Sequence, residues 1–271
     1  MVIFDENQFK MKTSLLISTY NWPHALELIL LSAENQTEKP DEILIADDGS
    51  TAETKALIED FRKKLPVEIK HFWHEDKGFR KSIILNKAIA AAQGDYIIQI
   101  DGDCIMHKDF IKDHKAMARP NTYLYGSRVN IQEDFLPTLF NTQKIAFNYF
   151  QKGIKKRNRN LRIPILSSFY RPQKTISKKM RGCNVSFWKK DVVAVNGYNE
   201  KFEGWGREDS ELIIRMMNNG VLGKRLRYLG IVYHIWHPIK DVSHLKRNND
   251  LQEKAIAEKS KWCEAGIAKY L

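Results

Sequence analysis

The N-terminal third of the chain alternates short apolar runs with stretches of helical periodicity, and this alternation limits the fold more than any other feature. The strand-length runs cover residues 13–20, 42–47, 67–72 and 96–100, and the helical stretches cover 23–35, a segment from about 52, and 81–92. Repeated β-α units of this length predict an α/β fold with a mostly parallel, Rossmann-like central sheet flanked by helices on both faces.

Polar residues follow three of the predicted strands. These are S-T-Y-N at 18–21, D-D-G-S at 47–50 and D-G-D at 101–103. Ligands bind beyond the carboxyl ends of strands in such sheets, so we expect a ligand site where the three segments meet. The chain has no G-x-x-x-x-G-K-[ST] and no G-x-G-x-x-G after the first strand, which argues against P-loop and dinucleotide-binding proteins.

Positive charge is concentrated in one segment. The net charge is +11, and residues 144–181 contain twelve Lys or Arg and no Asp or Glu, leaving 32 basic against 33 acidic residues elsewhere. No helix-turn-helix, zinc-finger or RNP-like motif accompanies these charges, so we expect no nucleic-acid partner. An aromatic-rich run begins the segment, which suits peripheral contact with an anionic membrane surface or with an anionic acceptor. A solvated basic loop over core aromatics is the alternative.

The compartment follows from cysteine usage and hydropathy. The three cysteines stand far apart without C-x-x-C spacing, which indicates a reducing compartment. The sequence shows no signal-peptide pattern and no apolar run long enough to cross a bilayer. We therefore expect a cytoplasmic protein that contacts the inner face of the membrane only peripherally.

Two acidic pairs are candidates for chemistry. Asp101 and Asp103 are two residues apart on an extended backbone, so both side chains point to one side, where they suit Mn²⁺ or Mg²⁺. A strand-terminating turn explains them equally well. Glu208 and Asp209 begin a predicted helix, whose dipole alone would favour acids there. Trp205 between two glycines suits a sugar-stacking lid, and two adjacent acids offer an acceptor contact and a general base.

Histidines and loop cations complete the set of candidates. His234 and His237 lie near the end of an apolar strand predicted for residues 226–234, and strand alternation would place them on opposite faces. At most one would then bind a metal, and His234 is the choice, with His237 left open. Lys77 and Arg80 lie between a strand and a helix, where a cation can reach a phosphate or a base, although surface charges are equally plausible.

Together these segments resemble the family-2 glycosyltransferases. The resemblance rests on I-S-T-Y-N, A-D-D-G-S-T, G-D-Y-I-I-Q-I-D-G-D-C-I and R-G-C-N-V-S-F…F-E-G-W-G-R-E-D-S-E, in this order. The last block is also similar to the C-terminal half of β1,4-galactosyltransferases and to bacterial chondroitin-polymerase-type enzymes. The resemblance spans residues 12–237 and implies a GT-A fold, a UDP-sugar donor, a divalent metal and inverting transfer. Galactosyltransferases of this type carry a glycine where this chain has Arg207.

The resemblance also implies a role for each matching residue. Donor contacts would come from Ser18, Tyr20, Asp48 and Asp101, with Tyr20 stacking on the uracil and Asp48 bonding its edge. Asp103 and His234 would bind the metal, Asp209 would be the catalytic base, and Trp205 and Glu208 would bind the acceptor. The implied division is an N-terminal extension (1–11), a nucleotide-sugar-binding half (12–130), a basic connecting segment (131–181), an acceptor and catalytic half (182–245) and a C-terminal helix (246–271).

The expected function is metal-dependent transfer of a hexose, galactose foremost, from a UDP-sugar to a glycan or lipid-linked glycan in bacterial surface polysaccharide synthesis. A sugar-1-phosphate nucleotidyltransferase is one alternative, but it normally carries a glycine-rich signature where this chain has S-T-Y-N-W-P. A non-catalytic basic protein that docks on a membrane or a nucleic acid is another. The four acids of the two pairs argue against it, because a binding module has little use for them.

Overall fold

The computed structural model describes residues 11–238 and 241–271, so most of the predicted N-terminal extension lies outside the described residues. The N-terminal part contains the predicted β-α units. Its elements are β1 (Thr13–Thr19), α1 (Pro23–Glu34), β2 (Glu42–Asp47), α2 (Ala52–Lys64), β3 (Glu68–Trp73), α3 (Lys81–Ala90), β4 (Tyr96–Asp101), β5 (Cys104–Met106) and α4 (Phe110–Met117).

The rest of the chain is less regular. It contains β6 (Thr122–Gly126), β7 (Arg128–Ile131), η1 (Glu133–Phe135), α5 (Leu136–Asn141), β8 (Ile154–Lys155), η2 (Arg157–Arg159), α6 (Pro164–Ser167), β9 (Asn184–Trp188), α7 (Lys189–Val193), α8 (Glu208–Asn218), β10 (Leu222–Leu226), β11 (Val232–His234), α9 (Leu245–Ala257) and η3 (Ile267–Tyr270). The helix predicted for 246–271 therefore ends at Ala257.

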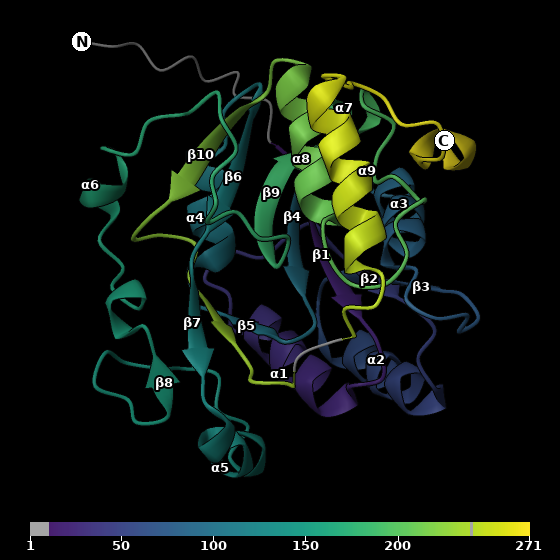
Figure 1. Ribbon diagram of the computed structural model, residues 1–271. Helices are drawn as coiled ribbons and strands as arrows, with labels where there is room; N and C mark the ends of the chain where they lie inside the picture. Colours follow the sequence, from purple (N-terminus) through teal and green to yellow (C-terminus); the bar gives the residue numbers. More distant parts are fainter. Residues whose placement is uncertain (1–10, 239–240) are drawn as a thin grey trace.

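The central sheet is mostly parallel, which confirms the predicted fold class. Its seven strands have the order β10-β6-β9-β4-β1-β2-β3 (Figure 1). β1 pairs in parallel with β2 and β4, whereas β9 is antiparallel to both of its neighbours, β4 and β6. A second sheet, β5-β11-β7-β8, lies beside the first.

Helices cover both faces of the central sheet because its inner strands are apolar on both sides. Leu15 and Ile17 of β1 pack into a core with α1 and α2, whereas Leu16 packs into a second core with α3 and α8. This alternation is the two-residue period of a strand. Figure 1 shows α3, α8 and α9 together on one face. The strand ends are thereby held rigidly between two cores.

The single strand predicted for residues 226–234 is wrong. β10 ends at Leu226 and β11 begins at Val232, and between them Tyr228 and Gly230 adopt φ values of 68° and 55°. The five residues between the two strands interrupt the pairing, so β10 joins β6 in the large sheet, whereas β11 joins β5 and β7 in the small one. The antiparallel register of β11 places His234 opposite Cys104, next to the D-G-D segment.

Candidate active site

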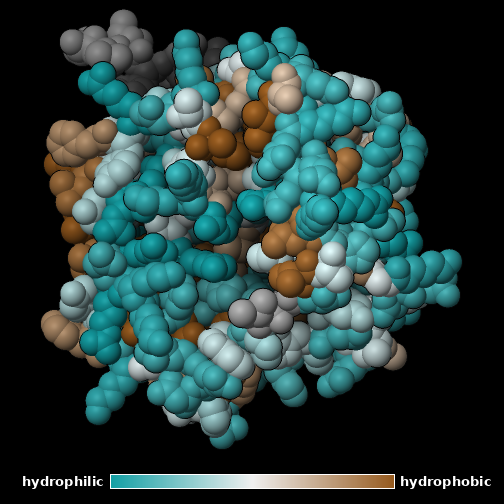
Figure 2. All heavy atoms as spheres, in the orientation of Figure 1, coloured by the Kyte–Doolittle hydropathy of each residue, from teal (hydrophilic) through white to brown (hydrophobic). Residues whose placement is uncertain are grey.

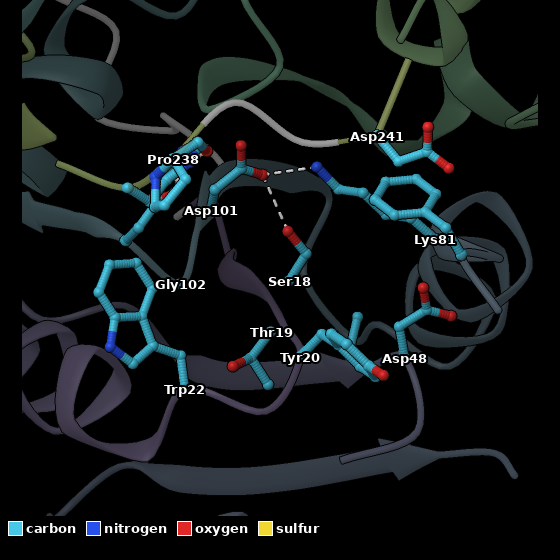
Figure 3. A pocket seen from close by; sticks show the side chains of 14 residues that line it. Ser18, Thr19, Tyr20, Trp22, Asp48, Lys81, Asp101, Gly102, Pro238 and Asp241 are labelled. Atoms are coloured by element: carbon cyan, nitrogen blue, oxygen red, sulfur yellow. Dashed lines mark hydrogen bonds and ion pairs between the residues drawn. The ribbon is translucent and has the colours of Figure 1, made fainter. Parts of the chain in front are cut away.

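The three polar segments converge on one cavity, as the sequence predicts. Parallel pairing aligns Ser18 of β1 with Asp101 of β4 and Thr19 with Asp47 of β2. The cavity at these strand ends has a volume of about 420 Å³. It is lined by Ser18, Thr19, Tyr20, Trp22, Ala46, Asp48, Phe79, Lys81, Asp101, Gly102, Asp103, His237, Pro238 and Asp241 (Figure 3).

Asp101 is held by two partners on one oxygen. Its Oδ1 accepts a hydrogen bond from Ser18 Oγ at 2.9 Å and pairs with Lys81 Nζ at 2.6 Å (Figure 3). The sequence reasoning missed Lys81, although it is the first residue of α3 and directly follows the predicted Arg80. Burial alone would lower the pKa of Lys81, but the carboxylates of Asp101 and Glu208 raise it above its ordinary value. The cation opposite Asp101 is therefore a lysine of the chain itself.

Asp48 and Tyr20 line the cavity, and hydrogen bonds to neighbouring residues orient both side chains. Asp48 accepts hydrogen bonds on Oδ2 from the backbone N–H of Arg80 at 2.9 Å and on Oδ1 from His74 Nε2 at 2.7 Å. Burial raises the pKa of the Asp48 carboxyl, with the His74 hydrogen bond opposing the effect. The Tyr20 hydroxyl donates to Asp76 Oδ2 at 2.8 Å, and the side chain is half exposed. An exposed ring at the cavity wall is available for stacking.

Lys77 and Arg80 are not among the residues that line this cavity. They line a neighbouring cavity of about 390 Å³ together with Trp205. The exposed Lys77 pairs with Glu75 at 2.9 Å, and the Arg80 guanidinium donates to the backbone carbonyl of Glu75. The cation that lines the cavity at the strand ends is Lys81.

Asp103, His234 and His237 form a cluster of candidate metal ligands. Asp103 Oδ2 lies 3.7 Å from His234 Nε2 and 3.4 Å from His237 Nε2, and one ligand atom from each residue lies within 4.8 Å of the others. Both histidines reach Asp103 because β11 ends at His234, so strand alternation no longer separates them. The backbone N–H of Ile235 donates to the Asp103 carbonyl at 2.8 Å and ties the two segments together.

This cluster fits a divalent cation. Its three donors are one carboxylate and two imidazoles, and burial lowers the pKa of His234, which favours the neutral imidazole that binds metals. Imidazole donors suit Mn²⁺ better than Mg²⁺, which prefers oxygen ligands. Gly102 keeps the preceding turn tight, because a Cβ there would lie 2.9 Å from the Ser18 carbonyl oxygen.

Glu208 and Asp209 begin α8 but lie in different surroundings. Glu208 is buried, and its Oε2 has no hydrogen-bond partner among the described residues. Burial, and then repulsion from Asp209, raise the pKa of Glu208 to about 7. Asp209 is half-buried and accepts backbone hydrogen bonds from Gly182 at 2.5 Å and Ser210 at 2.6 Å. The structure thus gives one enclosed, easily protonated acid and one accessible, backbone-oriented acid.

A second cavity meets the first at the two aspartates. It has a volume of about 930 Å³ and is lined by Asp101, Asp103, Arg128, Asn130, Ile131, Gln132, Glu133, Asp134, Lys155, Trp205, His234, Trp236, His237 and Pro238. Trp205 is 43% exposed and also lines the cavity that contains Lys77. Two ligands can therefore meet across the Asp101–Asp103 segment, with an exposed indole beside one of them.

Comparison with known proteins agrees with this geometry. The family model described as glycosyl transferase family 2 matches residues 14–179, and that of the N-terminal domain of galactosyltransferase matches residues 166–238. The chain is 27% identical over 224 residues to chondroitin synthase of Escherichia coli, covering 76% of this chain and 32% of that protein. It is 28% identical over 135 residues to cholesterol galactosyltransferase of Borreliella burgdorferi, covering 47% of this chain and 37% of that protein. The chain thus spans only about a third of these relatives.

Solved structures share the fold. TarS of S. aureus (residues 1–349), solved in complex with UDP, matches with a TM-score of 0.62 and 16% identity over 96% of this chain and 68% of that one. A mannosyltransferase of Pyrobaculum calidifontis, in complex with GDP-Man and Mn²⁺, matches with a TM-score of 0.60 and 17% identity over 93% of this chain and 65% of that one. In the described part of the chain, no helix combines the length and apolar character needed to cross a membrane.

The first of these models covers more than half of the chain. The protein is a member of glycosyltransferase family 2 with a GT-A fold.

Proposed function

We propose that this protein transfers a hexose, with galactose the leading candidate, from a UDP-sugar to a hydroxyl of a glycan or lipid-linked glycan, with inversion at the anomeric carbon. The observation that carries this proposal is the pair of cavities that share Asp101 and Asp103. The UDP and GDP-Man complexes of the structural neighbours support a nucleotide-sugar donor, and the galactosyltransferase match supports the sugar. Family membership favours glycosyl transfer over the nucleotidyltransferase and docking-protein alternatives.

In the proposed donor site the base and ribose of the donor lie in the cavity of about 420 Å³ at the strand ends, here named the donor cavity. The exposed Tyr20 ring stacks on the base. Asp48 forms a hydrogen bond with the edge of the base and gives up one of its present hydrogen bonds, such as the one from His74. Ser18 and Lys81 hold Asp101 toward the ribose. Lys77 and Arg80, one cavity away, serve the donor only if the loop that carries them moves.

We assign the metal site to Asp103, His234 and His237, and we propose Mn²⁺ as the ion because a structural neighbour was solved in complex with Mn²⁺. When bound, the metal neutralises the charge that develops on the departing diphosphate. Lys81 adds a fixed positive charge 2.6 Å from Asp101 Oδ1. A preorganised charge of this kind stabilises the transition state because it requires no reorganisation during the reaction.

Asp209 is the proposed catalytic base. A base must come within hydrogen-bonding distance of the acceptor hydroxyl, and Asp209 is half-buried, whereas Glu208 Oε2 is fully enclosed. Asp209 takes the proton from the acceptor hydroxyl while the hydroxyl oxygen attacks the anomeric carbon. The attack comes from the face opposite the diphosphate, which leaves. Glu208 and Trp205 are the proposed acceptor-binding residues, with the exposed Trp205 indole stacking on a sugar.

A panel of UDP-sugars with Mn²⁺, with UDP release followed in the presence and absence of sugar acceptors, tests the proposal. We expect Asp209→Asn to bind UDP normally and to lose transfer by roughly 10²-fold or more. Asp103→Ala should weaken Mn²⁺-dependent UDP binding, and Lys112→Gln, an exposed change on α4, serves as the control. Wild-type activity in Asp209→Asn would remove the assigned base. Absence of UDP binding to the wild-type protein would sink the proposal as a whole.

We further propose that the basic segment contacts the anionic cytoplasmic face of the membrane. Several large apolar side chains of this segment are exposed: Tyr149, Phe150, Leu161, Ile165, Leu166, Phe169 and Ile176. Figure 2 shows hydrophobic atoms gathered at the left edge of the molecule, over α6. Exposed apolar side chains among cations and no acids suit insertion between anionic lipid headgroups.

A further inference from the structure

A second concentration of charge lies outside the donor and metal sites. A cavity of about 130 Å³, here named the basic cavity, contains seven cations and no acid. It is lined by Gly126, Ser127, Arg128, Lys156, Arg159, Lys178, Lys179, Arg181, Cys183, Asn184 and Arg225. These residues come from β6, β7, η2, β9, β10 and the loop before β9, so the tertiary fold brings them together. Figure 2 shows hydrophilic side chains over the region between β10 and β8.

The positive charge of the basic cavity is not neutralised within the described part of the chain. None of its seven cations forms an ion pair with a described acidic residue. The arginines bond neutral oxygens instead: Arg159 Nη1 donates to the Arg128 carbonyl at 3.1 Å, and Arg225 Nη2 donates to Ser127 Oγ at 3.4 Å. Burial, and then the neighbouring cations, lower the pKa values of Lys156 and Arg159. Such mutual repulsion is relieved when an anion binds among the cations.

The shape of the basic cavity limits the anion. Its volume is well below the ~300–1,000 Å³ of clefts that enclose a drug-sized ligand, so it fits a single charged group and not a nucleotide or a sugar. An arginine has five N–H donors, and Arg159 and Arg225 use only part of theirs on neutral oxygens. Several guanidinium forks around one small space match the oxygens of a phosphate better than the two oxygens of a carboxylate.

The position of the basic cavity connects it with the acceptor side of the active site. Arg128 lines both the basic cavity and the large cavity that contains Trp205, Asp101 and Asp103. The donor cavity meets the large cavity at the two aspartates and shares no lining residue with the basic cavity. A molecule that extends from the aspartates past Arg128 thus places its far group among the seven cations.

We propose that the basic cavity binds a phosphate group of the acceptor and thereby selects phosphate-bearing acceptors. This inference rests on the proposed function, because only that function makes the bound phosphate part of a glycosyl acceptor. The phosphate belongs either to a phosphodiester in the acceptor chain or to the diphosphate that joins a glycan to a lipid. Both present the same oxygens to the arginines.

Calorimetric titration with inorganic phosphate tests the site directly. The protein is first saturated with UDP and Mg²⁺ so that the donor cavity is filled, and the titration is repeated without UDP. We expect phosphate to bind in both cases. The double variant Arg159→Gln/Arg225→Gln should bind phosphate at least roughly tenfold more weakly, because charge-assisted hydrogen bonds are lost.

A matched control separates the basic cavity from the general positive field. Arg157→Gln/Arg171→Gln makes the same change in net charge at exposed positions of the same segment, outside the cavity. It should bind phosphate within roughly twofold of the wild type. Retained UDP binding in both double variants shows that they fold. Equal weakening in the two variants, or phosphate binding only when UDP is absent, would overturn the inference.

Competition identifies the chemical source of the phosphate. Oligo(glycerol phosphate) represents a phosphodiester chain, and a polyprenyl diphosphate in detergent micelles represents a lipid anchor. Displacement of inorganic phosphate by either compound supports the inference and names the source. Stronger displacement by glucuronate contradicts the assignment of phosphate. If the wild-type protein binds phosphate but not UDP, the proposed function fails while the anion site stands.

Discussion

At the scale of single residues, Lys81 connects the two acidic motifs. Its Nζ lies 2.6 Å from Asp101 Oδ1, and it is close enough to Glu208 for each to shift the pKa of the other. Asp101 and Glu208 are 107 positions apart in the sequence, so neither motif predicts the other's environment. The lysine stabilises an otherwise costly concentration of negative charge at the strand ends.

Glu208 should make the stability of the protein depend on pH. Its pKa is raised from an ordinary 4.5 to about 7, so between these values the folded state holds a proton that the unfolded state releases. The contribution of Glu208 is present at low pH and is lost as pH rises through about 7. In Glu208→Gln, the fall in unfolding free energy from pH 5 to 8 should be smaller than in the wild type by roughly 2 kcal/mol.

Urea denaturation in EDTA at several pH values measures this difference. Glu253→Gln on the exposed face of α9 is the control and should keep the wild-type pH dependence. If Glu208→Gln and the wild type lose stability in parallel, the carboxyl of Glu208 is ionised throughout the range and its raised pKa is refuted.

At the scale of elements, the loop before α8 is built from left-handed backbone. Gly204, Gly206 and Arg207 have φ values of 68°, 105° and 78°. Arg207 occupies the position where similar galactosyltransferases carry glycine. Glycine suits this position because it has no Cβ and adopts a positive φ without strain. Here Arg207 Nε donates to Asn249 Oδ1 at 2.6 Å, which fastens the loop to α9. The loop that carries Trp205 is thus held by the hydrogen bond from the Arg207 side chain, although a non-glycine residue at this positive φ strains the backbone.

Two substitutions at Arg207 separate backbone strain from the contact with α9. Both Arg207→Gly and Arg207→Ala lose the hydrogen bond to Asn249, but only glycine relieves the positive φ. Arg207→Ala should therefore be less stable than Arg207→Gly by about 1 kcal/mol in urea denaturation. Equal stability of the two variants would mean that residue 207 does not keep a positive φ in solution.

At the scale of the whole molecule, charge and exposed apolar surface occur in the same segment. Phe150 and Phe169 are 82% and 76% exposed, and twelve cations lie between residues 144 and 181. Neither feature contributes to the core that supports the active site. The exposed apolar side chains suit the proposed contact with an anionic surface outside the protein, whereas five of the twelve cations line the basic cavity.

Sedimentation with vesicles tests this proposal. Phe150→Ser/Phe169→Ser should bind vesicles containing anionic phospholipid more than roughly tenfold more weakly than the wild type, because two apolar anchors are lost. The control, Ile256→Ser/Trp262→Ser, removes two exposed apolar side chains outside the basic segment. Binding should also fall with salt. Equal binding of both variants, or binding to neutral vesicles alone, would contradict the proposal.

Local sequence was sufficient for the β-α units and for the acids at their ends. Strand and helix periods act over short windows, and parallel strands place their carboxyl ends at one edge, so Ser18, Asp48 and Asp101 were expected together and lie in one cavity. Local sequence placed the end of a strand at His234 but could not predict which strands it pairs with. β11 pairs with β5 and β7, which are distant in sequence, and this pairing brings both His234 and His237 to Asp103.

The sequence by itself therefore determined the family, the alternation of strands and helices in the N-terminal part and the residue types at the site, because these depend on motifs and on local periodicity. Only the tertiary structure decided which charges meet. It placed Lys81 rather than Lys77 in the cavity at the strand ends, enclosed Glu208 while leaving Asp209 partly exposed, and collected seven cations around one small space. The physical reason is that electrostatic interactions depend on distance and burial in three dimensions, which the packing of elements far apart in the chain sets.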